Sequence, residues 1–126
     1  MRERAKWHDT EVIGDIPPRT GRRKEKRSSM PTYVSLVNWT DQGIRNIRDT
    51  LDRADRSAEV AEKHGASLQQ IYWTVGPYDI VSIVEAPDDE AATAYLLEIG
   101  SAGNVRTTTL RAYDREEMRR ILERLG

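Results

Sequence analysis

The chain has 126 residues, no cysteine and two histidines, and its formal net charge at pH 7 is −1. This length is typical of a single domain with one ordinary core, so a second domain is not expected. Without cysteine the chain forms no disulfide and offers neither a thiol nucleophile nor a thiolate ligand. The two histidines, His8 and His64, lie far apart in the sequence. We therefore expect no metal site and no cofactor.

The first 29 residues differ from the rest of the chain. They carry more basic than acidic side chains, with a basic cluster at 22–27, and they show no helical or strand periodicity. Such a segment cannot bury enough apolar surface to offset its ordering entropy. We predict a disordered basic tail over residues 1–29 and a folded domain over residues 30–126. The cluster is interpreted as part of a solvated tail, or as leader residues before a start at Met30, rather than as an arm that binds nucleic acid.

The remaining composition excludes two further kinds of partner. After residue 29 the chain is acidic, so it repels polyanions, and nucleic acid is not an expected partner. No apolar run approaches the roughly 18 residues that a membrane-spanning helix needs, and the start lacks the hydrophobic stretch of a signal peptide. We expect a cytoplasmic protein with no membrane partner.

The first strand and helix are predicted directly after residue 31. The run 32–39 is rich in β-branched and aromatic residues, which is typical of a strand. Thr40 offers a helix N-cap, and apolar residues then recur at three- and four-residue spacing from 44 to 61. This pattern predicts one amphipathic helix with a kink near residues 49–50. Gly65 supplies the C-cap, because the left-handed conformation costs glycine least.

The second half of the chain predicts a hairpin, a helix, a strand and a last helix. Two apolar runs, 68–75 and 78–86, flank the turn dipeptide Gly76-Pro77. A helix with acidic residues in its first turn follows from 87 to about 100, and residues 105–113 alternate as a strand does. Asp114 caps the last helix. We expect the apolar residues of this helix to point inward: Met118, Ile121, Leu122 and Leu125.

This order of elements predicts an α+β fold of the split βαββαβ (ferredoxin-like) type. An antiparallel sheet carries the helices on one face, and an extra helix follows at the C-terminus. We predict that one set of strand residues faces the helices: Val34, Leu36, Ile71, Trp73, Val81, Ile83 and Leu110. The alternate residues then lie on the open face, among them Tyr33, Val37, Tyr72, Ile80 and Val84. Such a face is too apolar to leave in water, so we expect a homodimer or higher oligomer formed by stacking of two sheets.

Three short motifs occur in order along the chain: Asn38-Trp39-Thr40-Asp41-Gln42-Gly43, Gly76-Pro77-Tyr78-Asp79 and Gly103-Asn104-Val105-Arg106-Thr107. Together they make the chain resemble the GYD domain family over about residues 30–118. The resemblance implies a dimeric α+β barrel, an architecture shared by small monooxygenase-like, isomerase-like and effector-binding domains. It implies no particular activity, because kinship of fold does not transfer function.

The predicted strand directions place all three motifs at one edge of the sheet, where the first helix also begins. A helix start suits an anion or a carboxylate, because its free N–H groups and positive dipole end face that position. We take seven residues as candidates for ligand binding: Trp39, Thr40, Asp41, Tyr72, Tyr78, Asp79 and Arg106.

Each candidate also has a structural interpretation. Asp79 is either a site carboxylate or a cap on backbone N–H groups at a tight turn, and we favour the cap. Arg106 either binds an anion or pairs with Asp79, and we favour the pair. Tyr72 and Tyr78 either line a pocket or fill a dimer interface, with no preference between the two. His64 is interpreted as a cation at a helix C-terminus and not as a catalytic base.

Three functions follow from these observations. The first is a non-enzymatic small-ligand-binding or regulatory homo-oligomer that holds a small, partly aromatic or anionic molecule between sheet and helix. It ranks first because no nucleophile, metal set or acid–base pair is evident, and no catalytic residue is assigned. The second is a cofactor-free monooxygenase-like or isomerase-like enzyme that positions its substrate with Tyr72, Tyr78, Asp79 and Arg106. The third is a purely structural oligomer, in which the stacked sheets leave no cavity.

Overall fold

A computed structural model describes residues 30–126, so the predicted tail over residues 1–29 lies outside the described residues. The elements follow the predicted order. They are β1 (Thr32–Trp39), α3 (Asp41–Arg45), η2 (Ile47–Asp49), α4 (Thr50–Lys63), β2 (Ser67–Trp73), β3 (Ile80–Glu85), α5 (Asp89–Ser101), β4 (Val105–Ala112) and α6 (Arg115–Glu123). Within residues 30–126, no helix is both long and apolar enough to cross a bilayer.

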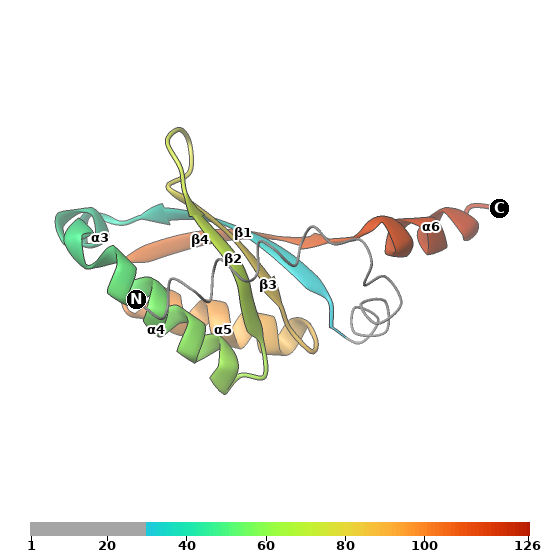
Figure 1. Ribbon diagram of the computed structural model, residues 1–126, viewed down its shortest axis with the longest axis horizontal. Helices are drawn as coiled ribbons and strands as arrows, with labels where there is room; N and C mark the ends of the chain where they lie inside the picture. Colours follow the sequence, from blue (N-terminus) through green and yellow to red (C-terminus); the bar gives the residue numbers. More distant parts are fainter. Residues whose placement is uncertain (1–29) are drawn as a thin grey trace.

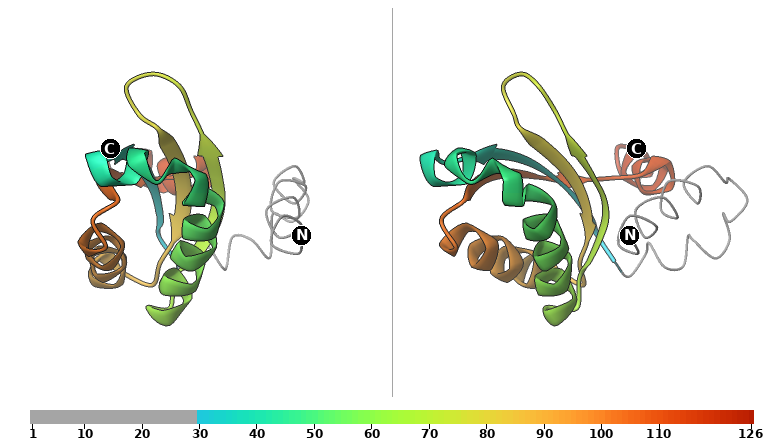
Figure 2. Two further views of the ribbon diagram at one scale, coloured as in Figure 1. Left: turned by 90° about the vertical axis from the view of Figure 1, so that its left-hand side faces the viewer. Right: turned by 60° about the vertical axis from the view of Figure 1, so that its left-hand side comes forward.

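The four strands form one antiparallel sheet with the order β2-β3-β1-β4. Helices α4 and α5 lie on one face of this sheet, and no described helix covers the opposite face (Figure 1 and Figure 2). Helix α6, at the red end of the chain, continues beyond β4 and extends away from the sheet (Figure 1). The predicted ferredoxin-like α+β fold is confirmed.

The predicted first helix consists of three pieces. Thr40 caps α3, and its Oγ1 accepts a hydrogen bond from the backbone N–H of Gly43 at 3.0 Å. The chain then passes through the 3₁₀ turn η2 before α4 begins at Thr50. The predicted kink near residues 49–50 is therefore confirmed. Gly65 follows α4 with a φ of 77°, in the left-handed region that favours glycine.

The core lies between the sheet and the two long helices. Buried side chains of the sheet meet small side chains of α4 and α5. The sheet contributes Tyr33, Val37, Ile80 and Val84, and the helices contribute Ala54, Ala58, Ala61, Ala92 and Tyr95. The alanines let both helices approach the sheet closely, as the dense packing of protein interiors requires.

The predicted assignment of sheet faces is wrong for β1, β3 and β4 and correct for β2. The residues that face the helices are Tyr33, Val37, Ile80 and Val84. The open face instead carries Val34, Leu36, Val81, Ile83 and Leu110. Ile71 and Trp73 do face the helices, because they pair with Ser82 and Ile80 on that side.

The error arises because both faces of β1 carry aliphatic side chains. Ser35 makes the helix face look polar in the sequence, and a shift of one residue exchanges the two faces of a strand. In the structure Ser35 and its neighbour Ser82 are buried beneath the helices. The Ser35 hydroxyl is satisfied there by a hydrogen bond with the Thr109 hydroxyl at 2.9 Å.

The predicted inward orientation of the last helix is wrong as well. Met118, Leu122 and Leu125 are 44%, 53% and 78% exposed. The buried residue of α6 is Glu117. The periodicity correctly predicts an amphipathic helix, but no described helix or strand lies against its apolar stripe (Figure 1).

Candidate functional site

The three sequence motifs meet at one edge of the sheet, as predicted. The backbone N–H of Thr40 donates to the carbonyl of Asn104 at 3.0 Å, and its hydroxyl donates to the carbonyl of Gly103 at 2.6 Å. On the other side of β1, the Asn38 side chain donates to the carbonyl of Pro77 at 2.8 Å. We call residues 38–43, 76–79 and 103–107 the motif junction.

Gly43 lies at the tightest contact of the motif junction. A Cβ at this position would lie 2.1 Å from the carbonyl oxygen of Asn104. The Gln42 side chain donates to Asn104 Oδ1 at 2.9 Å and to the carbonyl of Ala102 at 3.2 Å. At the helix start that we marked for an anion, the N–H of Gly43 is already capped by Thr40.

Asp79 acts as a cap, which is the interpretation favoured from the sequence. Its Oδ2 accepts from the backbone N–H of Trp39 at 2.9 Å and lies 3.5 Å from Asn38 Nδ2. Its own N–H donates to the carbonyl of Val37 at 2.8 Å. Arg106 lies on the other side of β1, opposite Asn38 in the register. Among residues 30–126 no ion pair joins Arg106 to Asp79, so the structure does not form the pair that we favoured.

The other candidates from the sequence lie apart from one another. Tyr72 is half exposed on the open face, and its hydroxyl donates to Gln70 Oε1 at 3.2 Å. Tyr78 lies in the loop between β2 and β3, where its carbonyl accepts from the Thr74 hydroxyl at 2.6 Å. Asp41 is exposed in the first turn of α3. The structure therefore bonds the side chains of Thr40 and Asp79 into the motif junction but does not gather the seven candidate side chains into one pocket.

A hollow lies beneath α4, between this helix, α5 and the sheet. This inner hollow has a volume of about 60 Å³, and its wall is mostly apolar. It is lined by Val37, Trp39, Thr50, Arg53, Ala54, Ser57, Leu68, Ile71, Ile80, Ser82, Tyr95, Ile99 and Val105. Of the seven candidates from the sequence, Trp39 contributes to this lining. The hollow depends on the packing of side chains from several elements, so no local sequence signal predicts it.

The indole N–H of Trp39 is buried and has no hydrogen-bond partner among the described residues. Other polar groups of the same wall are satisfied. The Trp73 indole donates to Thr50 Oγ1 at 3.0 Å. Burial raises the pKa of the Tyr95 hydroxyl, and a hydrogen bond with Ser57 partly opposes this rise. Since an unpartnered buried donor costs about 1–3 kcal/mol, the Trp39 indole is the unusual group of this wall.

A wider outer groove opens between α4 and α5, next to the inner hollow. Its volume is about 260 Å³, and it shares the side chains of Arg53, Ser57, Ile99 and Val105 with the hollow. Arg53 donates to the carbonyls of residues 46 and 43 at 2.7 and 3.2 Å. Arg56 also lines the groove and is exposed to solvent.

Glu98 is the acidic side chain of the outer groove. Its two carboxylate oxygens lie 2.8 Å from Lys63 Nζ and 2.8 Å from His64 Nε2, and these hydrogen bonds hold the pKa of Glu98 below its usual value. His64 lies at the C-terminal end of α4, the position expected of it from the sequence. In the described part of the chain, no three acidic or histidine side chains gather where they could hold a metal ion.

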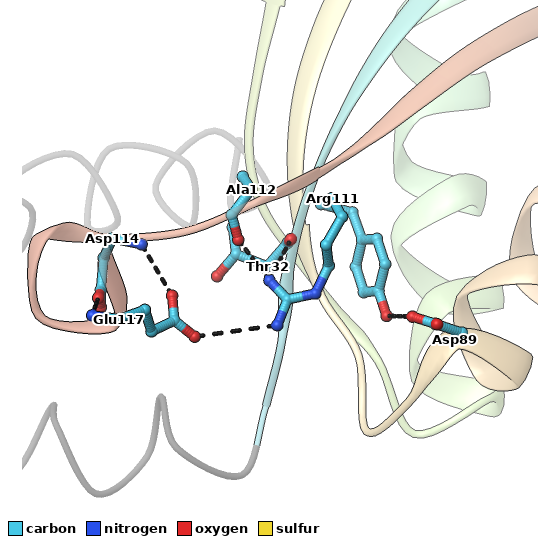
Figure 3. Close-up of polar contacts among 7 residues, drawn as sticks. Thr32, Asp89, Arg111, Ala112, Asp114 and Glu117 are labelled. Atoms are coloured by element: carbon cyan, nitrogen blue, oxygen red, sulfur yellow. Dashed lines mark hydrogen bonds and ion pairs between the residues drawn. The ribbon is translucent and has the colours of Figure 1, made fainter. Parts of the chain in front are cut away.

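A polar cluster that the sequence did not predict connects β1, α5, β4 and α6 (Figure 3). The Tyr33 hydroxyl donates to Asp89 Oδ1 at 2.5 Å, and burial together with Asp89 raises the pKa of Tyr33 to about 12. The Arg111 guanidinium lies 4.4 Å from the ring centre of Tyr113 and 5.7 Å from that of Tyr33. Its Nη2 lies 4.0 Å from Glu117 Oε2. Contacts between residues so distant in sequence leave no local signal.

The same cluster sets the direction in which α6 leaves the sheet. Glu117 Oε1 accepts from the backbone N–H of Asp114 at 2.7 Å, and Asp114 Oδ1 accepts from the backbone N–H of Glu117 at 2.8 Å. This reciprocal pair is a capping box, and the Asp-x-x-Glu spacing is its sequence signal. Arg111 donates to the carbonyl of Ala112 and reaches that of Thr32 at 3.5 Å. These contacts attach the start of α6 to the end of the sheet (Figure 3).

The fold and the site define a ferredoxin-like α+β module with a densely bonded motif junction and a small hollow under its helices. The model of the GYD domain family matches residues 33–122, which include all three motifs. The chain therefore belongs to the GYD domain family, and the resemblance inferred from the motifs is confirmed.

Three individual proteins are similar to this chain. The chain is 33% identical over 84 residues to the "Glutamine synthetase and cystathionine beta-lyase binding protein" of Thermus thermophilus, over 66% of this chain and 88% of the relative. The crystal structure of MtbAldR shares the fold with a TM-score of 0.56 at 15% identity, over 84% of this chain and 77% of that one. The crystal structure of TTHA0845, also from Thermus thermophilus, is 27% identical with a TM-score of 0.45, over 68% of this chain and all of that one.

Proposed function

We propose that this protein is a non-enzymatic, regulatory homo-oligomer that acts by binding other proteins in the cytoplasm. The observation that carries the proposal is the apolar surface that no other part of residues 30–126 covers. The open face carries Val34, Leu36, Val81, Ile83 and Leu110, and α6 exposes Met118, Leu122 and Leu125. Contiguous exposed apolar surface on a small domain is typical of an interaction site.

A second copy of the chain suits both apolar surfaces. Within one chain, the contacts of Arg111 and Glu117 direct α6 away from the sheet, so α6 does not lie over the open face (Figure 1 and Figure 3). In a two-fold dimer, each open face stacks on its counterpart, and each α6 lies against the other copy. One arrangement then covers both surfaces and completes the dimeric barrel that the family resemblance implies.

The Thermus relative supports a further protein partner. Its name states that it binds glutamine synthetase and cystathionine beta-lyase, and we propose that the dimer of this chain binds enzymes of these two kinds. The enzymatic alternative gains no support from the geometry. Its four residues, Tyr72, Tyr78, Asp79 and Arg106, do not line the inner hollow or the outer groove.

The proposal is tested by measuring the retention of purified glutamine synthetase and cystathionine beta-lyase, from the same source organism, on the immobilised chain. Leu110→Glu places a charge on the open face, and Leu122→Glu places one on α6. Leu97→Glu is the matched control, because Leu97 is 68% exposed on α5, away from both surfaces. We expect wild type and Leu97→Glu to retain at least one enzyme, and one of the other variants to lose it. Failure of the wild type to retain either enzyme would overturn the role in enzyme binding.

A further inference from the structure

The proposed dimer covers the open face and α6, so a bound enzyme must contact another part of the surface. Outside these two surfaces and the polar cluster around Arg111, five large apolar side chains of residues 30–126 are exposed: Ile44, Leu51, Trp73, Val75 and Leu97. Val75 is the most exposed of them, because its side chain is fully accessible to solvent. Val75 is therefore the first candidate for the contact with the enzyme.

Val75 lies in the loop that joins β2 to β3. This loop projects beyond the rest of the sheet at the top of Figure 1 and in both views of Figure 2. We call residues 74–78 the hairpin tip. The backbone N–H of Thr74 donates to the carbonyl of Asp79 at 2.8 Å, and its hydroxyl donates to the carbonyl of Tyr78 at 2.6 Å. These two hydrogen bonds close the turn that carries Val75.

The motif junction attaches the hairpin tip to β1. The Asn38 side chain donates to the carbonyl of Pro77 at 2.8 Å, and the N–H of Asp79 donates to the carbonyl of Val37 at 2.8 Å. Gly76 has a φ of 134°, which favours glycine, and proline fixes its own φ. A loop that is held in this way loses little conformational entropy when it binds. The dense bonding of the junction therefore keeps the tip in a form ready for a partner.

The hairpin tip belongs to an uncharged segment of a highly charged chain. No residue from 65 to 78 carries a charge, although 33% of all residues do. At the base of the tip, the partly exposed Trp73 donates from its indole to Thr50 Oγ1 at 3.0 Å, and Leu51, the next residue of α4, is exposed. Depletion of charge together with exposed aromatic side chains is typical of the centre of a protein–protein interface.

The shape of the hairpin tip favours a different protein over a second copy of the chain. A stable interface covers about 800 Å² on each partner, and two convex tips that meet end to end cover only a small part of that area. A convex apolar tip instead complements a concave apolar site, in which a buried anchor contributes much of the binding energy. Nucleic acid and anionic membranes are disfavoured, because the tip has no cation and residues 30–126 are acidic.

We infer that the hairpin tip inserts into a concave apolar site on the partner enzyme. Val75 fills this site, and the motif junction holds the tip in position. The inference rests on the proposed binding of glutamine synthetase or cystathionine beta-lyase. It also gives the dimer a role, because stacking of the open faces produces one particle with two tips, and two linked contacts bind more tightly than one.

The test measures the affinity of both purified enzymes, from the same source organism, for the full chain and its variants. Val75→Glu changes a fully exposed side chain, so the fold and the mass of the dimer should be unchanged. We expect this variant to bind about thirtyfold more weakly, as loss of an interface hot spot does. Val75→Leu keeps the tip apolar and should bind as the wild type does. Leu97→Glu is the matched control and should also bind normally.

Wild-type affinity in Val75→Glu would overturn the inference and leave the proposed enzyme binding intact, whereas failure of the wild type to bind either enzyme would overturn both. If light scattering shows that Val75→Glu falls to the mass of a single chain, the tip serves self-association and the inference is wrong. Sedimentation of the wild type, but not of Val75→Glu, with vesicles of phosphatidylcholine and phosphatidylglycerol in equal parts would assign the tip to a membrane and overturn the inference.

A further variant tests the role of the motif junction. Asn38→Ala removes the side chain that bonds to the carbonyl of Pro77, so the tip becomes less ordered before binding. Affinity for the enzyme should fall severalfold while the mass of the dimer stays the same. Full affinity in Asn38→Ala would overturn the positioning role of the junction. If Asn38→Ala does not fold, the comparison of Val75→Glu with Leu97→Glu decides the inference.

Discussion

The motif junction and the apolar surfaces of the open face and α6 differ in how far the chain satisfies its own groups. In the junction, Thr40 bonds to Gly103 and Asn104, and Asp79 bonds to the backbone of β1. On the open face and α6, leucines such as Leu110 and Leu122 remain half exposed, with no other part of residues 30–126 covering them. The motif residues that identify the family therefore stabilise the fold. The open face and α6, which carry no motif, are the surfaces that remain able to bind a second copy.

Trp39 belongs to the junction and also to the inner hollow. Its backbone N–H donates to Asp79 at 2.9 Å, whereas its indole N–H is buried without a described partner. One residue thus shows both behaviours: its main chain is bonded within the motif junction, and its indole N–H is left without a partner among the described residues. Substitutions in the motif junction should therefore change the free energy of unfolding much more than substitutions on the open face or α6.

The largest effect is expected from Gly43→Ala. The added methyl group would lie 2.1 Å from the Asn104 carbonyl oxygen, so the contact between α3 and the loop before β4 must open, at a cost of about 3 kcal/mol in the free energy of unfolding. Gly100→Ala is the control, because nothing lies within 4 Å of its Cβ and alanine in a helix gains about 0.5–1 kcal/mol over glycine. Urea unfolding measures both, and equal stability of the two variants would contradict the account of the junction.

A smaller loss, about 2 kcal/mol, is expected from Asp79→Ala, which leaves the backbone N–H of Trp39 without its acceptor. Asp79→Asn retains an acceptor oxygen and should cost less. Combined with Arg106→Met in a double-mutant cycle, Asp79→Asn should show a coupling within about 0.5 kcal/mol of zero, because no ion pair joins the two side chains among the described residues. A coupling of about 1 kcal/mol or more would restore the pair that we favoured from the sequence.

The third prediction concerns the loss of folding stability at alkaline pH. The pKa of Tyr33 is raised to about 12 from 10.0, so the folded state keeps its phenol proton at a pH where the unfolded state loses it. The contribution of Tyr33 to the free energy of unfolding is therefore fully present below pH 10 and is lost as the pH rises towards 12. At pH 11 this loss amounts to about 1.4 kcal/mol. Tyr33→Phe should remove this part of the pH dependence in denaturant titrations. If the free energy of unfolding of Tyr33→Phe falls with alkaline pH as steeply as that of the wild type, other groups cause the loss of stability.

The sequence predicted the elements, the helix caps and the convergence of the motifs, because these depend on local residue types and on the topology of the sheet. The caps of Thr40 and Asp114 need one side chain a few residues from the N–H it binds. The sheet faces were assigned wrongly because Ser35 made a buried face look polar. The inner hollow and the contact of Tyr33 with Asp89 could not be predicted, because they depend on how side chains distant in the sequence pack together.

The smallest effect is expected from deletion of residues 1–29. The composition of this segment cannot form a core, and the first strand starts at Thr32. Thermal unfolding should therefore show a nearly unchanged midpoint. A large decrease would mean that this segment docks on the domain.

The measurement that tests the central claim most directly is the mass of dilute protein in solution by light scattering. If the open face and α6 require a second copy, wild type and Leu97→Glu should have at least twice the chain mass of 14.4 kDa. Leu110→Glu should shift the mass towards that of a single chain, because a buried unpaired charge opposes sheet stacking. A monodisperse wild-type protein of 14.4 kDa would contradict the account, since its apolar open face would then be stable in water without a partner.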